Sequence, residues 1–308
     1  MTLHPEPKHV LSASRRTDIP AFYLDWFMDH IKQGIFDVTN PYTRKTRQIK
    51  VTPERFHSIV FWSKNFDVFI QTRAGEKLVQ KGFHLYFNFT INSESFILEP
   101  EIPPLRHRLD QLKRLSQSFG PRAISWRFDP ICFYHTPDTA LEQNNLSDFG
   151  KISDCAANLG IQTCVTSFFD HYKKIDHRLA CLKQQKKIDL VFIQPFLEKK
   201  QAVVQRMANQ LASKGICLHL CCEQDLFTTV KQTANIQENA CIDGKRLKSM
   251  YGGNPETRRD YGQRSKQGCL CTKSVDIGSY ALHPCFHNCL FCYASPDIDN
   301  TLKRTKIQ

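Results

Sequence analysis

The stretch Lys77-Leu-Val-Gln-Lys-Gly-Phe-His-Leu-Tyr-Phe-Asn-Phe-Thr-Ile91 decides the fold class. Its apolar run from His84 to Ile91 is rich in aromatic residues and has the length of a buried strand. Gly82 stands directly before this run, and glycine accepts the left-handed conformation that closes a helix. We therefore predict a helix that ends at Gly82 and leads straight into a buried strand.

The same unit recurs along the chain. Further apolar runs bounded by polar or turn residues predict strands at Val10 to Ser14, Ser58 to Ser63, Ala123 to Phe128, Thr163 to Phe169, Leu190 to Phe196 and Ile216 to Cys222. Amphipathic stretches predict helices at Phe22 to Lys32, Leu105 to Ser118 and Ala202 to Ser213, and closing glycines recur at Gly34, Gly120, Gly160 and Gly215. This alternation predicts an α/β fold with a parallel sheet, in the form of a complete or partial TIM-barrel-like barrel.

Polar residues follow several of the predicted strands. The candidates for catalysis among them are Arg15, Arg16, Asp18, Lys64, Asn65, Arg127 and Asp129, while Asp170 and Glu223 follow two further strands. In barrels this end of the strands carries the site. Polar residues also follow buried strands simply because loops contact water, and the sequence leaves both interpretations open. Trp62 and Trp126, within the same motifs, are predicted to be core residues.

The composition is that of a folded globular protein. Hydrophobic residues make up 41% of the 308 residues and charged residues 23%. The sequence has no export signal and no run of roughly 18 apolar residues, so we expect a cytoplasmic protein without a membrane partner. The net charge of +12 makes nucleic acid or a phosphorylated molecule a candidate partner, although enzymes that bind neither are also basic.

We expect three parts along the chain. Residues 1–223 form the α/β barrel core, residues 224–268 a polar and basic connection, and residues 269–308 a cysteine-rich, cluster-binding segment that packs on the barrel. A long loop in a compact domain is usually functional or disordered. The sequence leaves open whether the connection covers the site or lies on the surface.

The cysteines are placed unevenly, with none before Cys132. In Cys285-Phe-His-Asn-Cys289-Leu-Phe-Cys292, three thiolates can converge from one loop on three corners of a 4Fe-4S cluster. The fourth iron is then free to bind a small molecule, which is typical of catalytic clusters. His287 lies inside this loop, either as a contact of the cluster or as a hydrogen-bonding spacer.

Zinc is the competing metal. Cys289 and Cys292 together with Cys269 and Cys271 would supply four thiolates for a closed tetrahedral site. The aromatic residues around the last ligand favour a shielded cluster over zinc, and Cys241, Cys269 and Cys271 are candidates for an additional metal. The other cysteines lie in or beside apolar segments, where free cysteine packs as a small hydrophobe, and we predict them as core: Cys132, Cys155, Cys164, Cys181, Cys217, Cys221 and Cys222.

Two resemblances follow from these motifs. Over nearly the whole chain the sequence is similar to the domain of unknown function 1848 family, on Ser12-Ala-Ser-Arg-Arg-Thr-Asp-Ile-Pro20, Phe61-Trp-Ser-Lys-Asn65, Trp126-Arg-Phe-Asp-Pro130, Cys241-Ile-Asp-Gly244 and Asp276-Ile-Gly-Ser-Tyr280. The cysteine motif, with its continuation Cys292-Tyr293-Ala294, resembles the radical S-adenosylmethionine enzymes, in particular their DNA photoproduct lyase-like branch.

Radical S-adenosylmethionine enzymes carry the cysteine loop after the first strand of their barrel, whereas here it comes at the end. The resemblance therefore implies a circularly permuted barrel in which a last strand, from Ile277 to Pro284, lies beside the first. It also implies that the open iron binds S-adenosylmethionine and that an electron donor supports formation of a 5′-deoxyadenosyl radical. Arg15, Arg16, Lys64 and Arg127 would then hold carboxylate or phosphate groups of the substrate.

The leading hypothesis is a radical S-adenosylmethionine-type enzyme that acts on an anionic substrate, with nucleic acid as the first to be tried. One alternative is a nucleic-acid-binding protein with a structural zinc site. Another is a non-catalytic iron-sulfur redox protein. Metal content and the products of S-adenosylmethionine cleavage distinguish the three.

Overall fold

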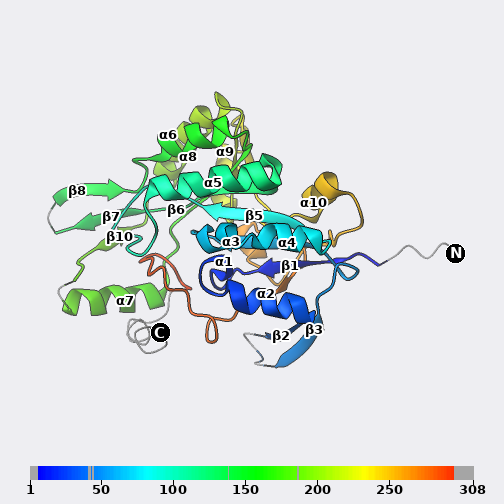
Figure 1. The fold of residues 1–308 in the computed structure, drawn as a ribbon. Helices are drawn as coiled ribbons and strands as arrows, with labels where there is room; N and C mark the ends of the chain where they lie inside the picture. The colour runs from blue at the N-terminus through cyan, green and yellow to red at the C-terminus, as the bar shows by residue number, and fades with distance from the viewer. Residues whose placement is uncertain (1–5, 41–42, 44, 138, 186, 295–308) are drawn as a thin grey trace.

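The fold is built around one parallel sheet, as the computed structural model shows (Figure 1). The structure describes residues 6–40, 43, 45–137, 139–185 and 187–294, so residues 295–308 of the predicted cysteine-rich segment lie outside the described residues. The strands of the sheet are β1 (His9–Ala13), β4 (Phe56–Ser63), β5 (His84–Thr90), β6 (Ile124–Ile131), β9 (Thr163–Phe168), β11 (Cys217–Leu220), β12 (Ile236–Glu238) and β13 (Val275–Asp276). Their order is β12-β11-β9-β6-β5-β4-β1-β13, and every neighbouring pair is parallel.

The central strands are buried on both faces. In β4 every residue except Trp62 is buried, which explains why its sequence is a continuous apolar run rather than an alternating one. Phe61 of β4 is in register with Phe87 of β5, and their rings stack with centroids 5.9 Å apart. Six of the seven predicted strands lie in this sheet, so the prediction of an α/β fold with a parallel sheet is confirmed.

The last strand of the sheet lies beside the first, because Val275 of β13 pairs in parallel with Leu11 of β1. The prediction that a last strand lies beside the first is therefore confirmed. The strand itself occupies Val275–Asp276 and not the predicted run from Ile277 to Pro284. Within the described part of the chain no pairing joins β12 to β13, so the ladder of strands is open between them.

Asp276 fastens β13 to the end of β1. Its carboxylate accepts hydrogen bonds from the hydroxyls of Ser12 (2.9 Å) and Ser14 (2.6 Å) and from the backbone N–H groups of Arg15 (2.8 Å) and Gly278 (3.0 Å). The two segments approach so closely that a Cβ atom at Gly278 would lie 2.0 Å from Ser14 Oγ. A glycine is therefore required there by the packing of β13 against β1.

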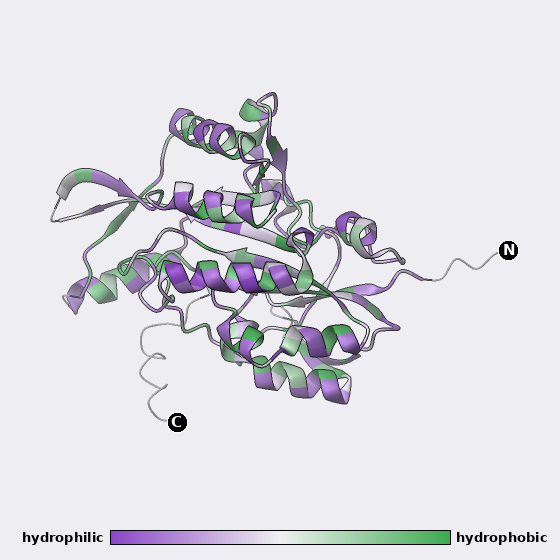
Figure 2. Cartoon of the chain, turned by 45° about the horizontal axis from the view of Figure 1, so that its top comes forward, coloured by the Kyte–Doolittle hydropathy of each residue, from purple (hydrophilic) through white to green (hydrophobic). Residues whose placement is uncertain are grey.

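The helices pack apolar faces against the sheet. Hydrophilic and hydrophobic residues alternate along the helical ribbons in Figure 2, as amphipathic helices on a sheet require. The three predicted helices correspond to α2 (Leu24–Gln33), α5 (Leu105–Phe119) and α8 (Leu197–Ala212), and the others are α1 (Ile19–Phe22), α3 (Asp67–Gln71), α4 (Ala74–Gln80), α6 (Phe149–Asn158), α7 (Lys173–Gln184), α9 (Gln224–Val230) and α10 (Gly244–Tyr251). The five glycines predicted to close helices all have positive φ, between 69° and 95°.

One predicted strand belongs to a different sheet. The run from Leu190 to Phe196 forms only the short strand β10 (Val191–Ile193). This strand pairs antiparallel with β7 (Phe133–Thr136), which in turn pairs with β8 (Thr139–Asn144). The run lies outside the main sheet, and although Leu190 is buried, Val191 is 62% and Phe196 83% accessible.

Two further regions carry structure that the sequence did not predict. An antiparallel hairpin joins β2 (Ile35–Thr39) to β3 (Thr46–Lys50) beside the main sheet. The stretch 224–268, predicted as a connection, contains α9, the edge strand β12 and α10. This stretch is therefore an integral part of the fold as well as a link to the cysteine-rich segment.

Candidate functional site

A cavity of about 330 Å³ opens at the carboxyl ends of the parallel strands. Residues at or near the ends of seven strands line it: Arg15 after β1, Lys64 after β4, Thr90 in β5, Asp129 in β6, Asp170 after β9, Cys222 after β11 and Cys241 after β12. Parallel sheets bring the ends of separate strands together at one edge, which is where such folds build their sites. We refer to this space as the site cavity.

Four of the seven polar candidates line the site cavity, namely Arg15, Lys64, Arg127 and Asp129. The other three lie outside its lining and have structural partners. Arg16 Nη1 donates to the carbonyl oxygen of Gly278 (3.0 Å), and Asn65 Oδ1 accepts from Gln111 Nε2 (2.8 Å). Asp18 is buried and anchors the cysteine motif, as described below.

Trp62 contacts two guanidinium groups at the cavity wall. The Cζ atoms of Arg15 and Arg127 each lie 5.4 Å from the centroid of its ring, within the range of cation–π interactions. Trp62 was predicted to be a core residue, but the structure places it in the lining of the cavity. Trp126, with 0% exposure, is the core residue that the sequence predicted.

Arg127 connects the acidic and the sulfur-containing parts of the cavity. Its Nη2 lies 2.5 Å from Asp129 Oδ2, and its Nη1 donates to Cys241 Sγ at 2.9 Å. Burial alone would lower the pKa of Arg127, but the neighbouring Cys241 and Asp129 outweigh it and raise that pKa well above its ordinary value. The guanidinium is therefore permanently charged, and Asp129 is further held by the Ser167 hydroxyl.

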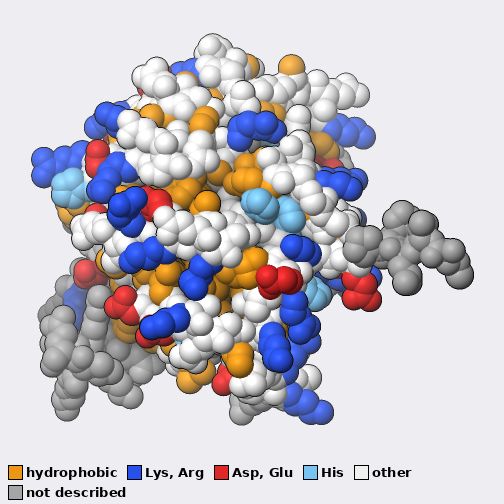
Figure 3. Space-filling model, turned by 45° about the vertical axis from the view of Figure 1, so that its right-hand side comes forward, with side chains coloured by type: hydrophobic (Ala, Val, Ile, Leu, Met, Phe, Trp, Pro, Cys, Tyr) orange, Lys and Arg blue, Asp and Glu red, His pale blue; other side chains and the backbone are white. Residues whose placement is uncertain are grey.

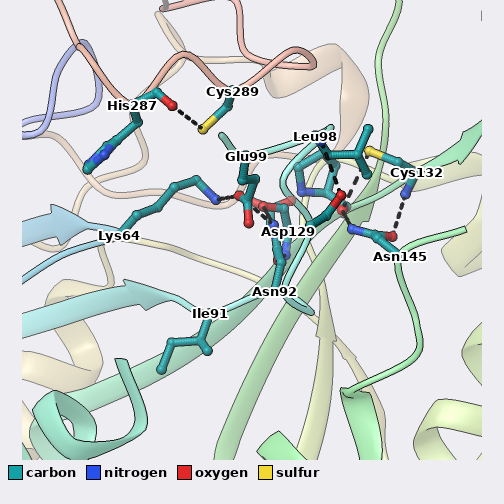
Figure 4. A network of polar contacts seen from close by, with 12 residues as sticks. Lys64, Ile91, Asn92, Leu98, Glu99, Asp129, Cys132, Asn145, His287 and Cys289 are labelled. Carbon is teal, nitrogen blue, oxygen red and sulfur yellow. Dashed lines mark hydrogen bonds and ion pairs between the residues drawn. The ribbon is translucent and has the colours of Figure 1, made fainter. Parts of the chain in front are cut away.

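Lys64 reaches Glu99 in a largely buried ion pair with Nζ and Oε1 2.5 Å apart (Figure 4). Asn92 Nδ2 also donates to Glu99 Oε1 (3.1 Å), and Asn92 Oδ1 accepts from the backbone N–H of Asp129 (2.8 Å). Burial lowers the pKa of Lys64, but Glu99 and Cys289 more than compensate, so its pKa is raised. An ammonium group thus stands between a carboxylate and the cysteine motif.

Cys285, Cys289 and Cys292 lie at the same end of the sheet as the cavity. Cys285 and Cys289 are buried, whereas Cys292 is half-buried and lines the cavity. Burial raises the pKa of the Cys285 and Cys289 thiols, and the carboxylate of Asp18 adds to the rise at Cys285. Metal ligation requires thiolates, so binding of a metal here would release protons.

Arg178 of α7 holds this loop from behind. Its Nη1 donates to the carbonyl oxygens of Cys289 (3.2 Å), Leu290 (3.2 Å) and Cys292 (3.0 Å). Arg178 was not among the site residues predicted from the sequence. The available signal was its position three residues after Ile175, on the buried face of α7, where a charged residue is unusual unless it has partners.

His287 and Asp18 tie the loop to the strand ends. His287 Nε2 lies 2.7 Å from Asp18 Oδ2, and both side chains are buried. Asp18 also accepts from the Ser63 hydroxyl (2.7 Å) and from the backbone N–H groups of Lys64 (2.9 Å) and Ala21 (3.0 Å). His287 therefore makes the contact of a hydrogen-bonding spacer, one of the two roles that the sequence left open.

Five other cysteines lie together on another part of the cavity wall, and we call them the sulfur ring: Cys221, Cys222, Cys241, Cys269 and Cys271. Cys221 Sγ lies 3.4 Å from Cys241 Sγ and 3.9 Å from Cys222 Sγ. Cys269 contacts Cys222, and Cys271 contacts both Cys241 and Cys269, which closes the ring. Cys221 and Cys222 were predicted to be core residues: Cys221 is buried, as predicted, whereas Cys222 is half-buried, and both also line the cavity.

The remaining cysteines fit the predicted packing role. Cys132 and Cys164 are buried, and Cys155, Cys181 and Cys217 are half-buried. Among the residues that the structure describes, no three His, Cys, Asp or Glu side chains are already arranged as ligands of one metal ion. The loop and the sulfur ring nevertheless offer thiols, which are the soft ligands that iron-sulfur clusters and zinc require.

The basic stretch before Cys269 contributes to the cavity. Arg264 lines it and pairs with Asp170 on its rim. On the face shown in Figure 3, Lys and Arg side chains are spread out rather than gathered in one patch. In the described part of the chain, no helix combines the length and the apolar character needed to cross a membrane.

Comparison with solved structures gives weak similarities. D-hydantoinase from Bacillus sp. AR9 matches with 13% identity and a TM-score of 0.30 over 60% of this chain and 40% of the hydantoinase. Dihydropyrimidinase from Brevibacillus agri NCHU1002 matches with 12% identity and a TM-score of 0.33 over 60% of this chain and 39% of that enzyme. The carboxyl transferase domain of Rhizobium etli pyruvate carboxylase matches with 8% identity and a TM-score of 0.26 over 86% and 45%. The chain thus spans less than half the length of each, and scores this low carry no argument about fold or function.

Comparison at the level of sequence is more informative. A search among curated proteins gives no match. A family model, in contrast, matches residues 10–294, which includes β1, every strand of the main sheet and the cysteine motif. The chain belongs to the family described as Domain of unknown function (DUF1848).

Proposed function

We propose that this protein is an iron-sulfur enzyme of the radical S-adenosylmethionine type, with the site cavity as its active site. One observation carries the proposal: Cys292 of a three-cysteine loop faces the same cavity as Arg15, Lys64 and Arg127, which come from three separate strands. A metal-binding loop and basic side chains that share one concave space are a combination suited to catalysis on an anionic molecule.

The residues of the loop fit a cluster with one open iron. Cys285, Cys289 and Cys292 would be its three thiolate ligands, since their spacing and soft sulfur donors suit iron rather than a hard cation. When bound with S-adenosylmethionine, such a cluster supplies one-electron cleavage of the sulfonium to methionine and a 5′-deoxyadenosyl radical, with the electron coming from an external donor. The chain itself would bind, orient and shield.

The basic side chains differ in what they can still bind. Arg127 and Lys64 are already paired with carboxylates, at 2.5 Å in each case. Arg15 still has a free donor, because its Nη2 is buried and has no hydrogen-bond partner among the described residues. Arg15 is therefore the residue we assign to a carboxylate or phosphate of the bound molecule, with Trp62 as a flat apolar surface beside it.

The proposal includes a barrel that is permuted relative to radical S-adenosylmethionine enzymes. The permutation is supported by the pairing of β13 with β1. β13 leads into the cysteine loop, so this pairing brings a C-terminal loop to the end of the N-terminal strand, where the cavity opens. A cavity of about 330 Å³ holds a small molecule or a single nucleotide rather than a duplex. We propose an anionic small molecule or one unit of a nucleic acid as the substrate, in the reducing cytoplasm.

The zinc alternative finds less support. It requires Cys269 and Cys271 to complete a site with Cys289 and Cys292. The sulfur neighbours of Cys269 and Cys271 are instead Cys222 and Cys241. A nucleic-acid-binding role without catalysis also lacks a concentrated basic patch on the face seen in Figure 3.

Anaerobically purified and reconstituted protein provides the test. Reduced with dithionite and supplied with S-adenosylmethionine, it should release 5′-deoxyadenosine and methionine, and its electron paramagnetic resonance signal should change when S-adenosylmethionine is added. Cys289→Ala should lose both properties, whereas Cys155→Ser, a cysteine of α6, should keep them. A folded protein that binds zinc without iron, or that binds iron without cleaving S-adenosylmethionine, would refute the proposal.

A further inference from the structure

The sulfur ring is a second concentration of thiol groups, separate from the cysteine loop in sequence. Its five members come from three segments: Cys221 and Cys222 follow β11, Cys241 follows β12, and Cys269 and Cys271 precede β13. Cys221 Sγ lies 3.4 Å from Cys241 Sγ and 3.9 Å from Cys222 Sγ, Cys222 contacts Cys269, and Cys271 contacts Cys241 and Cys269. Segments that are distant along the chain thus bring five thiols together.

The backbone at Cys222 brings two consecutive cysteines to the same side. Successive residues of an extended strand point to opposite faces. Cys222 has φ of 59°, in the left-handed region that a non-glycine residue adopts at some cost. As a result both Cys221 and Cys222 line the cavity, which an extended backbone would not allow.

Hydrogen-bond donors are directed at the sulfur atoms. Arg127 Nη1 and Asn239 Nδ2 each lie 2.9 Å from Cys241 Sγ. Arg15 contacts Cys271 and places a second positive charge beside the ring. Donors and cations around sulfur stabilise thiolates and are the second shell that metal-thiolate centres use.

Ordinary packing explains these contacts less well. Cys164 shows what a packed cysteine looks like in this protein, because it is 0% exposed and belongs to the main apolar core cluster. The ring instead lines a cavity and is flanked by two arginines that a purely apolar cluster would exclude. A closed structural zinc site needs four thiolates, whereas five thiols here line one cavity of about 330 Å³.

We infer that Cys221, Cys222, Cys241, Cys269 and Cys271 form a second metal site, which binds an iron-sulfur cluster through four of the five thiolates. The site shares the cavity with Cys292 but uses no residue of the cysteine loop. The inference is therefore independent of the proposed function: the ring should hold its cluster whether or not the loop binds S-adenosylmethionine.

Iron and sulfide analysis of three variants tests the inference. Reconstituted wild-type protein should contain about eight iron and eight sulfide per chain, the content of two cubane clusters. The triple variant Cys285→Ala/Cys289→Ala/Cys292→Ala removes the loop ligands and should retain about half of the iron with an intact 4Fe-4S spectrum. The double variant Cys241→Ser/Cys271→Ser should lose the other half, and the control Cys155→Ser should lose none.

The triple variant decides the question even if the double variant fails to fold, because it leaves the ring intact. A folded triple variant without iron would overturn the inference. Stoichiometric zinc in that variant, lost again when Cys241 and Cys271 are replaced, would overturn the assignment to iron. Disulfides between ring cysteines in anaerobically purified protein, detected by mass spectrometry, would also overturn it. Wild-type protein that contains about eight iron per chain but does not cleave S-adenosylmethionine would refute the proposed function and would leave this inference standing.

Discussion

Replacing Asp276 with alanine should detach the last strand from the first. The carboxylate accepts four hydrogen bonds of 2.6 to 3.0 Å, two from serine hydroxyls and two from backbone N–H groups. β13 has only two residues, so backbone pairing to β1 contributes little, and the side chain carries most of the connection. Hydrogen bonds to a charged group contribute about 1.5–3 kcal/mol each, but water can replace some of them at this half-buried position. We expect a loss of about 3–5 kcal/mol in the free energy of unfolding.

Urea unfolding followed by circular dichroism measures this loss, and limited proteolysis under native conditions locates it. Cleavage should appear first in residues 273–294, because these depend on β13 for their position. Asp37→Ala is the matched control, since Asp37 lies on the exposed hairpin and accepts one long hydrogen bond of 3.5 Å. A destabilisation by Asp276→Ala below about 1 kcal/mol, equal to that of the control, would show that β13 is held by something other than this carboxylate.

Three further outcomes are expected. Glu99→Ala leaves the buried charge of Lys64 without its main partner and should cost about 3–5 kcal/mol of stability in urea unfolding; an unchanged midpoint would refute this. Arg178→Met removes the donor to three carbonyls of the cysteine loop and should make loop-bound iron several-fold faster to extract with a chelator, without changing iron bound elsewhere. Burial lowers the pKa of His57, so the unfolded state binds more protons below about pH 6.5 and stability should fall as the pH drops through that value. His57→Gln should flatten this dependence, and an equally steep pH profile in the variant would refute the assignment.

The main sheet was predictable because its strands are buried on both faces. Runs such as His84 to Ile91 show no alternation of apolar and polar residues, and a glycine at the preceding helix end marks where β5, β6, β9 and β11 begin. The run from Leu190 to Phe196 has the same composition but a different environment. Apolar content alone cannot separate a central strand from a projecting one, and only the antiparallel pairing with β7 reveals the difference.

The site was predictable in part for the same reason. Strand ends gave Arg15, Lys64, Arg127 and Asp129, because parallel strands bring their ends to one edge. Arg15 and Arg16 are adjacent in the sequence, but the side chain of Arg16 is directed to Gly278 and not into the cavity. The sequence does not show which of two adjacent arginines faces a cavity.

The sulfur ring was the least predictable feature. Cys221 and Cys222 end an apolar strand, so they carry the same local pattern as a core cysteine such as Cys164. Their partners Cys241 and Cys269 are distant in sequence. The left-handed backbone at Cys222 also has no glycine that would have indicated it in the sequence. Grouping of this kind depends on the tertiary fold and has no local signal.

The pairing of β13 with β1 joins two strands that the ribosome makes at very different times. The ribosome adds roughly 5–20 residues per second, so on the order of 10–50 s separate the emergence of β1 from that of β13. During this interval one edge of β1 has no partner and is open to chaperones or to pairing with other nascent chains. The thiols that follow β13 emerge later still. On the proposed function, metal can therefore be inserted at the loop only after every strand of the main sheet has been synthesised.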